Sequence, residues 1–244
     1  PYKAGQYANL AIEGLSGVVR SYSFATPSHR DALVSFLIRK VPDGQFSSLV
    51  NDADVMGRGV RVDGPHGDFW LRGGQAPLLF VAGGSGLAPI LAMLKEAAAR
   101  GVSRPATLLF GARTQQDLYA LDELESIGKQ WGAAFRFVPV LSHAADDASW
   151  TGRRGFVTEH IAELLEPGAH AYLCGPPVMI DGAIEQLQRH GVSREHVHFD
   201  RFTTQADAAL AASDPAHASA AASLAAPETT AGFLDYFKYF AFHF

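Results

Sequence analysis

The sequence predicts two domains, a small antiparallel β barrel followed by an α/β domain with a parallel sheet. Residues 5–71 hold short β patterns separated by Gly, Pro, Asp and Ser, and such closely spaced strands are typical of small barrels and sandwiches. From residue 78 onward, strand patterns alternate with helix-length segments. That alternation is typical of βαβ units, and it predicts a parallel sheet with helices on both faces.

The length and composition of the chain exclude several classes of protein. With 244 residues, of which 48% are hydrophobic, the chain can bury the cores of two medium-sized domains. A net charge of −5 without a run of Lys or Arg argues against nucleic acid as a partner. The single cysteine, Cys174, excludes a disulfide framework and a four-cysteine iron–sulfur cluster within this chain. No signal peptide is visible, so a cytoplasmic location is the default expectation.

The expected N-terminal domain spans residues 1–74, with a junction at residues 72–75. The chain enters a strand pattern soon after Pro1, so we expect the first strands of the barrel to be missing. Residues 64–67 are expected to form a tight turn between strands, and residues 44–48 a turn into a short helix, with Ser47 or Ser48 near its N-terminus, that suits a phosphate. The expected strands are residues 5–12, 18–25, 32–40, 59–64 and 68–71.

The expected α/β domain spans residues 75–205. Its strands are expected at residues 78–82, 106–112, 135–140, 170–174 and 196–200, and its helices at residues 90–100, 121–131, 157–165 and 178–190. In open sheets of this kind, ligands bind at the carboxyl ends of the strands. The loops at residues 83–86, 111–113 and 174–177 all follow strand ends, so we expect them to meet at one crevice.

Residues 78–90 read as a buried strand, a glycine turn and the start of a helix. Backbone N–H groups and the positive end of a helix dipole face outward together at such a corner, which is therefore suited to a phosphate. The dinucleotide fingerprint G-x-G-x-x-G fits from Gly84 except that Pro89 replaces its third glycine, which disfavours an ordinary Rossmann dehydrogenase. The hydrolase elbow G-x-S-x-G fails because Leu87 replaces its last glycine.

Arg20, Ser21, Tyr22 and Ser23 close a β pattern with a cation, an aromatic ring and two hydroxyls. Strand alternation places Arg20 and Tyr22 on one face and the two serines on the other, although a bend at the strand end can bring Ser23 round. A guanidinium suits a pyrophosphate and an aromatic ring suits a flat heterocycle. The same residues also fit an ordinary surface strand.

Seven motifs in order, RSYS, GQFS, GPHG, VAGGSGLAPI, FGAR, YLCGPP and FDRF, resemble the ferredoxin–NADP reductase superfamily. The resemblance covers about residues 5–202 and is greatest to the reductase components of bacterial multicomponent monooxygenases of the soluble diiron type. It implies a flavin-binding barrel followed by a nicotinamide-nucleotide-binding domain. It also implies an NAD(P)H-dependent flavin oxidoreductase that takes hydride from NADH onto FAD.

The resemblance implies a role for each motif. Arg20 would hold the FAD pyrophosphate, Tyr22 would stack on the isoalloxazine, and Ser23 would hydrogen-bond near flavin N5. The backbone around residues 38–40, with residues 44–47, would complete the flavin phosphate site. Residues 83–89 would take the pyrophosphate of the nicotinamide nucleotide, and residues 174–176 would border its nicotinamide. The implied catalytic residues are Ser23, Cys174 and Phe202, of which Phe202 would cover the second flavin face. The implied cofactor-binding residues are Arg20, Ser21, Tyr22, Ser23, Ile38, Arg39, Lys40, Gly44, Gln45, Phe46, Ser47, Gly83, Gly84, Ser85, Gly86, Pro89, Arg113, Cys174, Gly175, Pro176 and Phe202.

The implied partners are a ferredoxin-like iron–sulfur domain or protein, which receives single electrons, and the oxygenase that it feeds. NADH is the expected donor, with NADPH as the alternative, since Arg113 can contact either a 2′-phosphate or a ribose and Asp117 comes only four residues later. His196 and His198 lack further ligands at metal spacing, so we expect no metal.

Two other functions fit the same sequence. A free flavin reductase would use flavin as a substrate, and a non-catalytic nucleotide-binding interaction subunit would use the C-terminal segment as its working part. That segment, residues 233–244, follows an Ala-rich linker at residues 206–232. It is too short for a membrane-spanning helix, which needs about 20 residues. It fits an aromatic docking or interfacial segment, the start of a further domain, or packing on the chain's own surface.

Overall fold

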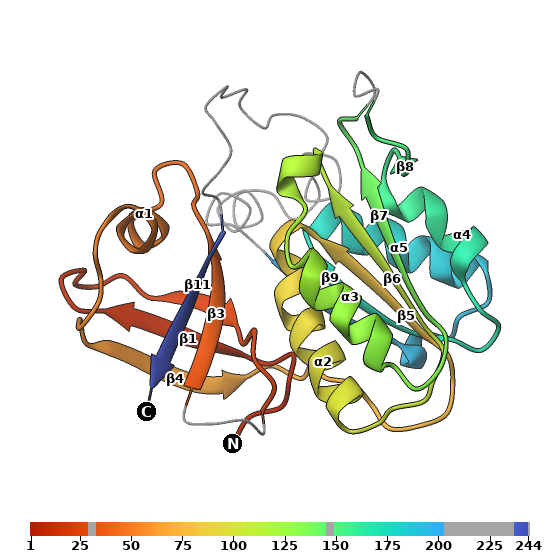
Figure 1. Cartoon of the computed structure of the whole chain (residues 1–244), viewed down its shortest axis with the longest axis horizontal. Coiled ribbons are helices and arrows are strands. Elements are labelled where there is room, and N and C mark those ends of the chain that lie inside the picture. The colour runs from red at the N-terminus through yellow and green to blue at the C-terminus, as the bar shows by residue number, and fades with distance from the viewer. Residues whose placement is uncertain (29–32, 145–148, 203–236, 244) are drawn as a thin grey trace.

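The structure is a computed structural model that describes residues 1–28, 33–144, 149–202 and 237–243. Two domains lie side by side (Figure 1), one built from the N-terminal strands together with the C-terminal strand, and the other from the strands between them with helices around them. The predicted fold class is therefore confirmed. Both ends of the chain lie beside the N-terminal domain (Figure 1).

The N-terminal domain contains β1 (Tyr7–Ile12), β2 (Arg20–Ser23), β3 (Leu33–Arg39), the helix α1 (Gln45–Asp52), β4 (Val60–His66) and, from the far end of the sequence, β11 (Phe237–His243). Two antiparallel sheets form, one with the order β2-β1-β4 and the other pairing β3 with β11. Every second residue of β1 is buried, as a half-buried strand requires. These residues meet Phe36 of β3 and Phe46 of α1 in one core.

Two predictions for this domain are wrong. Residues 68–71 form no strand, because Phe69 leaves the sheet and packs in the core of the second domain. Residues 64–67 are not a turn between two strands, because β4 continues through the cis Gly64–Pro65 bond to His66, which pairs with Tyr7 across a shift in register. A Cβ at Gly64 would lie 3.0 Å from that of Ala8, so a glycine allows this close approach of β4 to β1.

The C-terminal domain is a six-stranded parallel sheet with the order β10-β9-β5-β6-β7-β8. The bounds are β5 Leu78–Gly83, α2 Leu87–Ala99, β6 Ala106–Ala112, α3 Leu121–Gln130, β7 Phe135–Leu141, β8 Arg153–Arg154, α4 Ile161–Leu164, β9 His170–Gly175, α5 Pro177–Arg189 and β10 Val197–Arg201. Short 3₁₀ turns lie at Gly84–Gly86, Gln115–Asp117, Val157–His160 and Arg194–His196. The five predicted strands and the predicted helices are all present. The helix expected at residues 157–165 consists of a 3₁₀ turn and one short α-helix, and the two-residue β8 was not predicted.

Helices cover both faces of this sheet, as predicted (Figure 1). On one face, α2 and α3 pack on side chains that include Phe80 and Phe110. On the other face, α4 and α5 pack on a second cluster that includes Val81 and Leu109. Neighbouring residues of β5 thus point to opposite cores, as a fully buried parallel strand requires.

The two domains contact each other directly. Leu37 of β3 packs with Ala25 and with Ala88 in the first turn of α2. On the same side, Ser28 donates hydrogen bonds from its backbone N–H and its hydroxyl to the Glu96 carboxylate, at 3.0 and 2.6 Å. The N-terminal sheet domain is thereby held against α2 at both its first turn and its last turn.

A buried arginine holds the junction between the domains. Arg104 is 4% exposed, and its guanidinium donates to the carbonyl oxygens of Ala76 (2.5 Å) and Arg72 (2.9 Å). The Tyr172 hydroxyl of β9 accepts a hydrogen bond from the Arg72 N–H at 2.9 Å. The junction is therefore hydrogen-bonded to the second domain at both of its ends.

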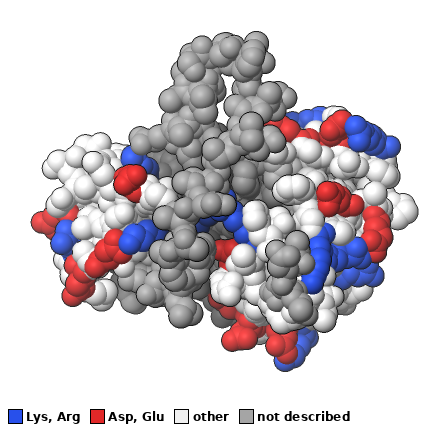
Figure 2. Space-filling model, turned by 90° about the horizontal axis from the view of Figure 1, so that it is seen from above, with Lys and Arg blue, Asp and Glu red and all other residues white. Residues whose placement is uncertain are grey.

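Acidic and basic side chains are mixed over both domains on the face shown in Figure 2. Within the part of the chain that the structure describes, no helix is long and apolar enough to cross a membrane.

Candidate functional site

The turn after β5 is shaped by its glycines. The chain passes from Gly83 through the 3₁₀ turn into α2, and Gly84 has a φ of +52°, which favours glycine. A Cβ at Gly84 would meet no atom within 4 Å, whereas one at Gly86 would lie 2.1 Å from the Cys174 carbonyl oxygen. One side of the turn is thus packed against the end of β9 and the other is open.

The open side faces the start of a 13-residue helix, whose first-turn N–H groups lack partners within the helix. Pro89, which lacks an N–H, stands in this first turn and costs no hydrogen bond there. The Tyr119 hydroxyl donates to the Gly84 carbonyl oxygen at 3.0 Å and so fixes the turn from the side of β6. The corner fits a phosphate group bound by backbone N–H groups.

The end of β9 lies beside this turn. Cys174 pairs with Ala82 of β5 and is fully buried, and burial raises the pKa of its thiol well above the usual value. Gly175 follows with a φ of +153°, and a Cβ there would lie 2.8 Å from the Met179 methyl group and 3.1 Å from the Gly83 nitrogen. Pro176 precedes the first residue of α5. The three predicted loops are brought to one edge of the sheet, since Gly83 also pairs with Gly111.

Asp200 of β10 is a neighbour of Cys174 that the sequence analysis did not single out. It pairs with Cys174 across the sheet, and burial, with a smaller effect of the Asp68 carboxylate, raises the pKa of Asp200 to about 6. Two residues further on, the Phe202 N–H donates to the Gly175 carbonyl oxygen at 2.9 Å. The half-buried Phe202 side chain packs against the core that contains Cys174.

The side chains of β2 alternate between the two faces of the strand, as the sequence predicted. Arg20 and Tyr22 lie on the same face, while Ser21 is exposed on the other face and donates its hydroxyl to Asn9 at 2.7 Å. Tyr22 lies 5.5 Å from the Phe46 ring, and burial raises the pKa of its phenol to about 12, against a smaller lowering by Arg20. Ser23, which ends the strand, is 6% exposed. Tyr22 is therefore a neutral, half-buried aromatic surface next to a cation.

The corner between β3 and α1 is held by its own side chains. The Ser47 hydroxyl donates to the Gly44 carbonyl oxygen and accepts from the Val41 N–H, both at 3.1 Å. Lys40 forms a 2.6 Å ion pair with Asp52. Ile38 is buried, while Arg39 and Gln45 are exposed. The polar side chains that stabilise this corner are engaged locally, which leaves mainly backbone groups for a ligand.

The loop after β6 carries Arg113 on the surface. The Asp117 carboxylate accepts hydrogen bonds from the N–H and the hydroxyl of Thr114, at 2.9 and 3.0 Å. Asp117 therefore caps its own 3₁₀ turn.

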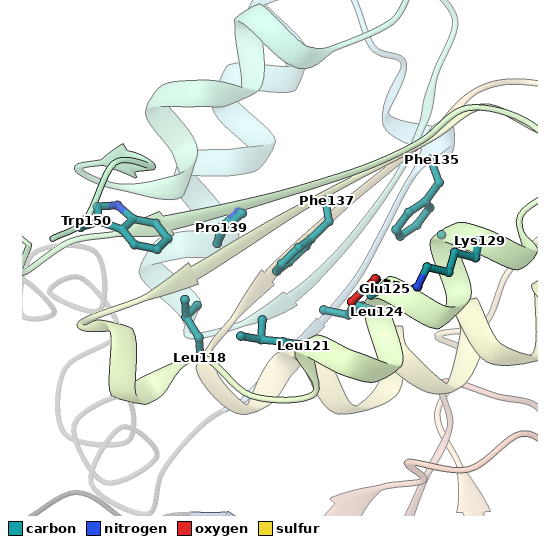
Figure 3. A pocket seen from close by; sticks show the side chains of 10 residues that line it. Leu118, Leu121, Leu124, Glu125, Lys129, Phe135, Phe137, Pro139 and Trp150 are labelled. Atoms are coloured by element: carbon teal, nitrogen blue, oxygen red, sulfur yellow. Dashed lines mark ion pairs between the residues drawn. The ribbon is translucent and has the colours of Figure 1, made fainter.

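A hollow of 560 Å³ lies between α3 and β7, away from the glycine turns. Its wall consists of apolar side chains from the two elements, with Trp150 at one end and the Glu125–Lys129 ion pair near the other (Figure 3). None of the predicted cofactor-binding residues lines it. The predicted site residues lie instead at the strand-end turns of the second domain and on β2, β3 and α1 of the N-terminal domain.

Two family descriptions match the chain and divide it as the fold does. "Oxidoreductase FAD-binding domain" matches residues 1–70, and "Oxidoreductase NAD-binding domain" matches residues 80–185. The chain belongs to the FAD- and NAD-binding oxidoreductases of the ferredoxin–NADP reductase type.

Relatives within this family include reductase components of oxygenases. The chain is 44% identical over 199 residues to the xylene/toluene monooxygenase electron transfer component XylA of Pseudomonas putida, covering 81% of this chain and 57% of that protein. It is 38% identical over 213 residues to the phenol 2-monooxygenase reductase component DmpP of Pseudomonas sp. strain CF600, covering 86% and 60%. The Amycolatopsis cytochrome P450 reductase GcoB has the same fold, with a TM-score of 0.73 and 34% identity over 83% of this chain and 62% of that one. The chain thus spans about three fifths of each of these relatives.

Sequence reasoning missed Tyr119, Asn51 and Asp200. Tyr119 and Asn51 act through hydrogen bonds to backbone carbonyls far along the chain or one helix turn away, which no local pattern reveals. Asp200 stands within the FDRF motif, and its position two residues before Phe202 was the available signal.

Cys174 is expected to resist alkylation in the folded protein. The thiolate is the reactive form, and both burial and the raised pKa of Cys174 disfavour it. We expect iodoacetamide to label Cys174 at pH 8 at least about a hundredfold more slowly in native protein than in protein unfolded in guanidinium. Mass spectrometry of timed samples measures both rates, and similar rates would contradict the buried position of the thiol.

Proposed function

We propose that this chain binds FAD and NADH, transfers hydride from NADH to the flavin, and passes electrons singly to an iron–sulfur centre that feeds an oxygenase. The observation that carries the proposal is the contact between Leu37 of β3 and Ala88 of α2. It joins the strand that leads into the predicted flavin corner to the helix that begins at the predicted nucleotide turn. Ligands held by these two elements would be neighbours.

The chain's residues fit both cofactors. The open side of the Gly84 turn and the amino-terminal end of α2 suit a pyrophosphate. Arg20 and Tyr22 offer a cation and a flat apolar ring on one face of β2, which suits a flavin nucleotide. FAD, when bound, accepts a hydride from a reduced nicotinamide and can release the two electrons one at a time.

The protein's contribution would be positioning and exclusion of water. Tyr22 would hold one face of the flavin and Phe202 would cover the other until the nicotinamide takes its place. The buried Cys174 would act as a small wall beside the nicotinamide and not as a nucleophile, since burial keeps it protonated. Ser23 would donate a hydrogen bond near flavin N5.

NADH is the proposed donor. Asp117, the nearest acidic residue after β6, is engaged with Thr114, so coenzyme choice at this loop would depend on the exposed Arg113. An anaerobic titration of the purified, flavin-loaded chain with NADH and then NADPH tests this. Bleaching of the flavin absorbance at lower NADH than NADPH concentration supports the proposal, and no bleaching with either nucleotide overturns it.

Two further measurements on the same purified protein distinguish the proposed function from the two alternatives. A free flavin reductase would lose its flavin on gel filtration, whereas the proposed electron-transfer component would retain FAD. An interaction subunit would bind nucleotide without reducing artificial one-electron acceptors such as ferricyanide.

Replacing Tyr22 by alanine is expected to weaken FAD binding about ten- to a hundredfold. Stacking of a flat heterocycle on an aromatic side chain contributes about 1–3 kcal/mol, which corresponds to that range. Tyr22→Phe keeps the ring and is the matched control, with an expected change of less than about threefold. Fluorescence titration with FAD measures both affinities. Equal affinities for the Tyr22→Ala variant and the wild type would mean that this ring does not contact the flavin.

A further inference from the structure

The C-terminal strand β11 pairs with β3 over its whole length. The two strands are antiparallel, from Phe237 opposite Arg39 to His243 opposite Leu33. Figure 1 shows β11 running alongside β3 in the N-terminal domain. Of the uses considered for this segment, the backbone pairing favours packing on the chain's own surface.

β3 is a strand that needs partners along both edges. One edge is bonded to the chain after β2, where the Ala25 N–H donates to the Ser35 carbonyl oxygen at 2.8 Å and Phe24 forms a bridge with Phe36. Both faces of β3 are buried, since Phe36 lies in the N-terminal core and Leu37 faces the second domain. Backbone groups left unpaired in such a strand cost free energy, and β11 pairs the remaining edge.

The carboxyl end of β3 leads directly into the predicted flavin phosphate corner. The Ile38 carbonyl oxygen accepts a hydrogen bond from Asn51 of α1 at 3.3 Å, and Lys40 is paired with Asp52 of the same helix. β11 reaches this end of the strand, because Lys238 is opposite Ile38. The position of the corner therefore depends on β3, which accepts a hydrogen bond from Asn51 of α1 and pairs with β11 along one edge.

We propose that β11 is a donor strand that closes the flavin domain, and that the retention of FAD depends on its pairing with β3. The proposal rests on the proposed flavin function. It assigns the C-terminal segment to the cofactor site of its own chain. In chemical terms, the open edge of β3 accepts an extended peptide by antiparallel main-chain hydrogen bonding, as in β-strand addition.

A double proline variant of the full chain tests the proposal. In a strand, the N–H groups of consecutive residues point to opposite edges, so Tyr239→Pro with Phe240→Pro removes at least one N–H that faces β3. The matched control exchanges the same two residues, Tyr239→Phe with Phe240→Tyr, which keeps the composition and both N–H groups. Hydrogen exchange followed by mass spectrometry gives a measure of pairing that does not depend on activity.

We expect exchange of the β3 amides to be at least about tenfold faster in the proline variant, with β5 and β9 unchanged. We expect its dissociation constant for FAD to rise at least about tenfold, and the control variant to match the wild type. A synthetic peptide of residues 233–244, added to the proline variant, is expected to restore both properties. A peptide with the two prolines is expected to restore neither.

Each other outcome overturns the proposal. Faster exchange in β3 with unchanged FAD affinity would show that the strand pairs without supporting the flavin site. Unchanged exchange would show that β11 does not protect β3. Loss of protection in β5 and β9 as well would mean that the strand supports the whole fold and not the flavin domain. A wild-type chain that takes up no FAD overturns the proposed function itself, whereas wild-type binding with no effect of the prolines overturns this proposal alone.

Discussion

Replacing Gly86 by alanine is expected to lower the free energy of unfolding by about 3 kcal/mol and to weaken NADH binding at least about tenfold. The added Cβ would lie 2.1 Å from the Cys174 carbonyl oxygen and 2.8 Å from the Gly175 nitrogen. These are backbone atoms at the end of β9, so no side chain can rotate out of the way. The turn after β5 and the end of β9 must separate, and both border the predicted nucleotide site.

The steric origin of this effect can be separated from backbone strain. Gly86 has helical angles, with φ −62° and ψ −12°, which alanine adopts readily. Gly84 presents the opposite case, since its φ of +52° disfavours alanine while its Cβ would meet open space. Gly84→Ala is therefore expected to cost only about 1 kcal/mol. Gly73→Ala, at a junction position with no atom within 4 Å, is a control expected to stay within about 0.5 kcal/mol of the wild type.

Chemical denaturation gives the stabilities, and quenching of flavin fluorescence or calorimetry with NADH gives the affinities. Stability and affinity of the Gly86→Ala variant equal to those of the wild type would mean that β5 and β9 do not approach as closely as the structure shows. A loss in Gly84→Ala larger than that in Gly86→Ala would mean that strain, and not space, governs this turn.

The strands of the parallel sheet were predictable because each can be recognised from its own short stretch of sequence. Continuous apolar runs such as residues 106–112 are buried on both faces, and the glycine, proline and polar residues between runs mark their ends. The glycine turn was predictable for the same reason, because a positive φ and a close approach of two backbones both favour glycine at that position. The sequence also predicted that three loops meet at one edge, since parallel strands place their carboxyl ends together.

The errors lie where a distant contact decides the outcome. Residues 68–71 have a strand pattern, but the Phe69 side chain packs in the core of the second domain, so the chain leaves the sheet at this point. The sequence of Gly64 and Pro65 is typical of a turn, yet the pairing of His66 with Tyr7 extends β4 past it. Arg104 is another residue whose role depends on a distant contact. An arginine in a connecting segment gives no local sign that its guanidinium will hydrogen-bond to backbone carbonyls of the domain junction. The pairing of β11 with β3 joins the two ends of the sequence, which no local pattern encodes.

The roles of individual site residues followed from the resemblance, while the structure adds which of their groups are engaged. Ser47 and Lys40 form local contacts, and Ser21 points away from Arg20 and Tyr22. These three are therefore the weakest of the predicted flavin contacts through side chains. Tyr22 and the open side of the Gly84 turn keep surfaces that a ligand can use, and the decisive mutations belong there.

Replacing Asp200 by asparagine is expected to stabilise the protein at pH 7.5 by about 2 kcal/mol and to leave its stability at pH 4 almost unchanged. Burial raises the pKa of Asp200 to about 6 in the folded chain, against an ordinary value of about 3.9 in the unfolded chain. Between these values, the unfolded chain has lost the proton while the folded chain still holds it. The unfolded state then binds fewer protons, so the free energy of unfolding falls as the pH rises from about 4 to 6.

Above pH 6 the ionised Asp200 carboxylate imposes its full cost, which the amide of asparagine does not carry. The full shift corresponds to about 3 kcal/mol, and partial solvent access reduces the expected value to about 2 kcal/mol. Urea denaturation of both proteins from pH 4 to pH 8 measures the difference, with the exposed Glu166→Gln variant as a control expected to show less than about 0.5 kcal/mol at any pH. Asp68→Asn should move the midpoint of the Asp200 effect to lower pH, because the Asp68 carboxylate contributes to the raised pKa of Asp200. A difference between Asp200→Asn and wild type that is the same at pH 4 and pH 7.5 would show that packing, and not ionisation of a carboxyl group held beside Cys174, determines the role of this residue.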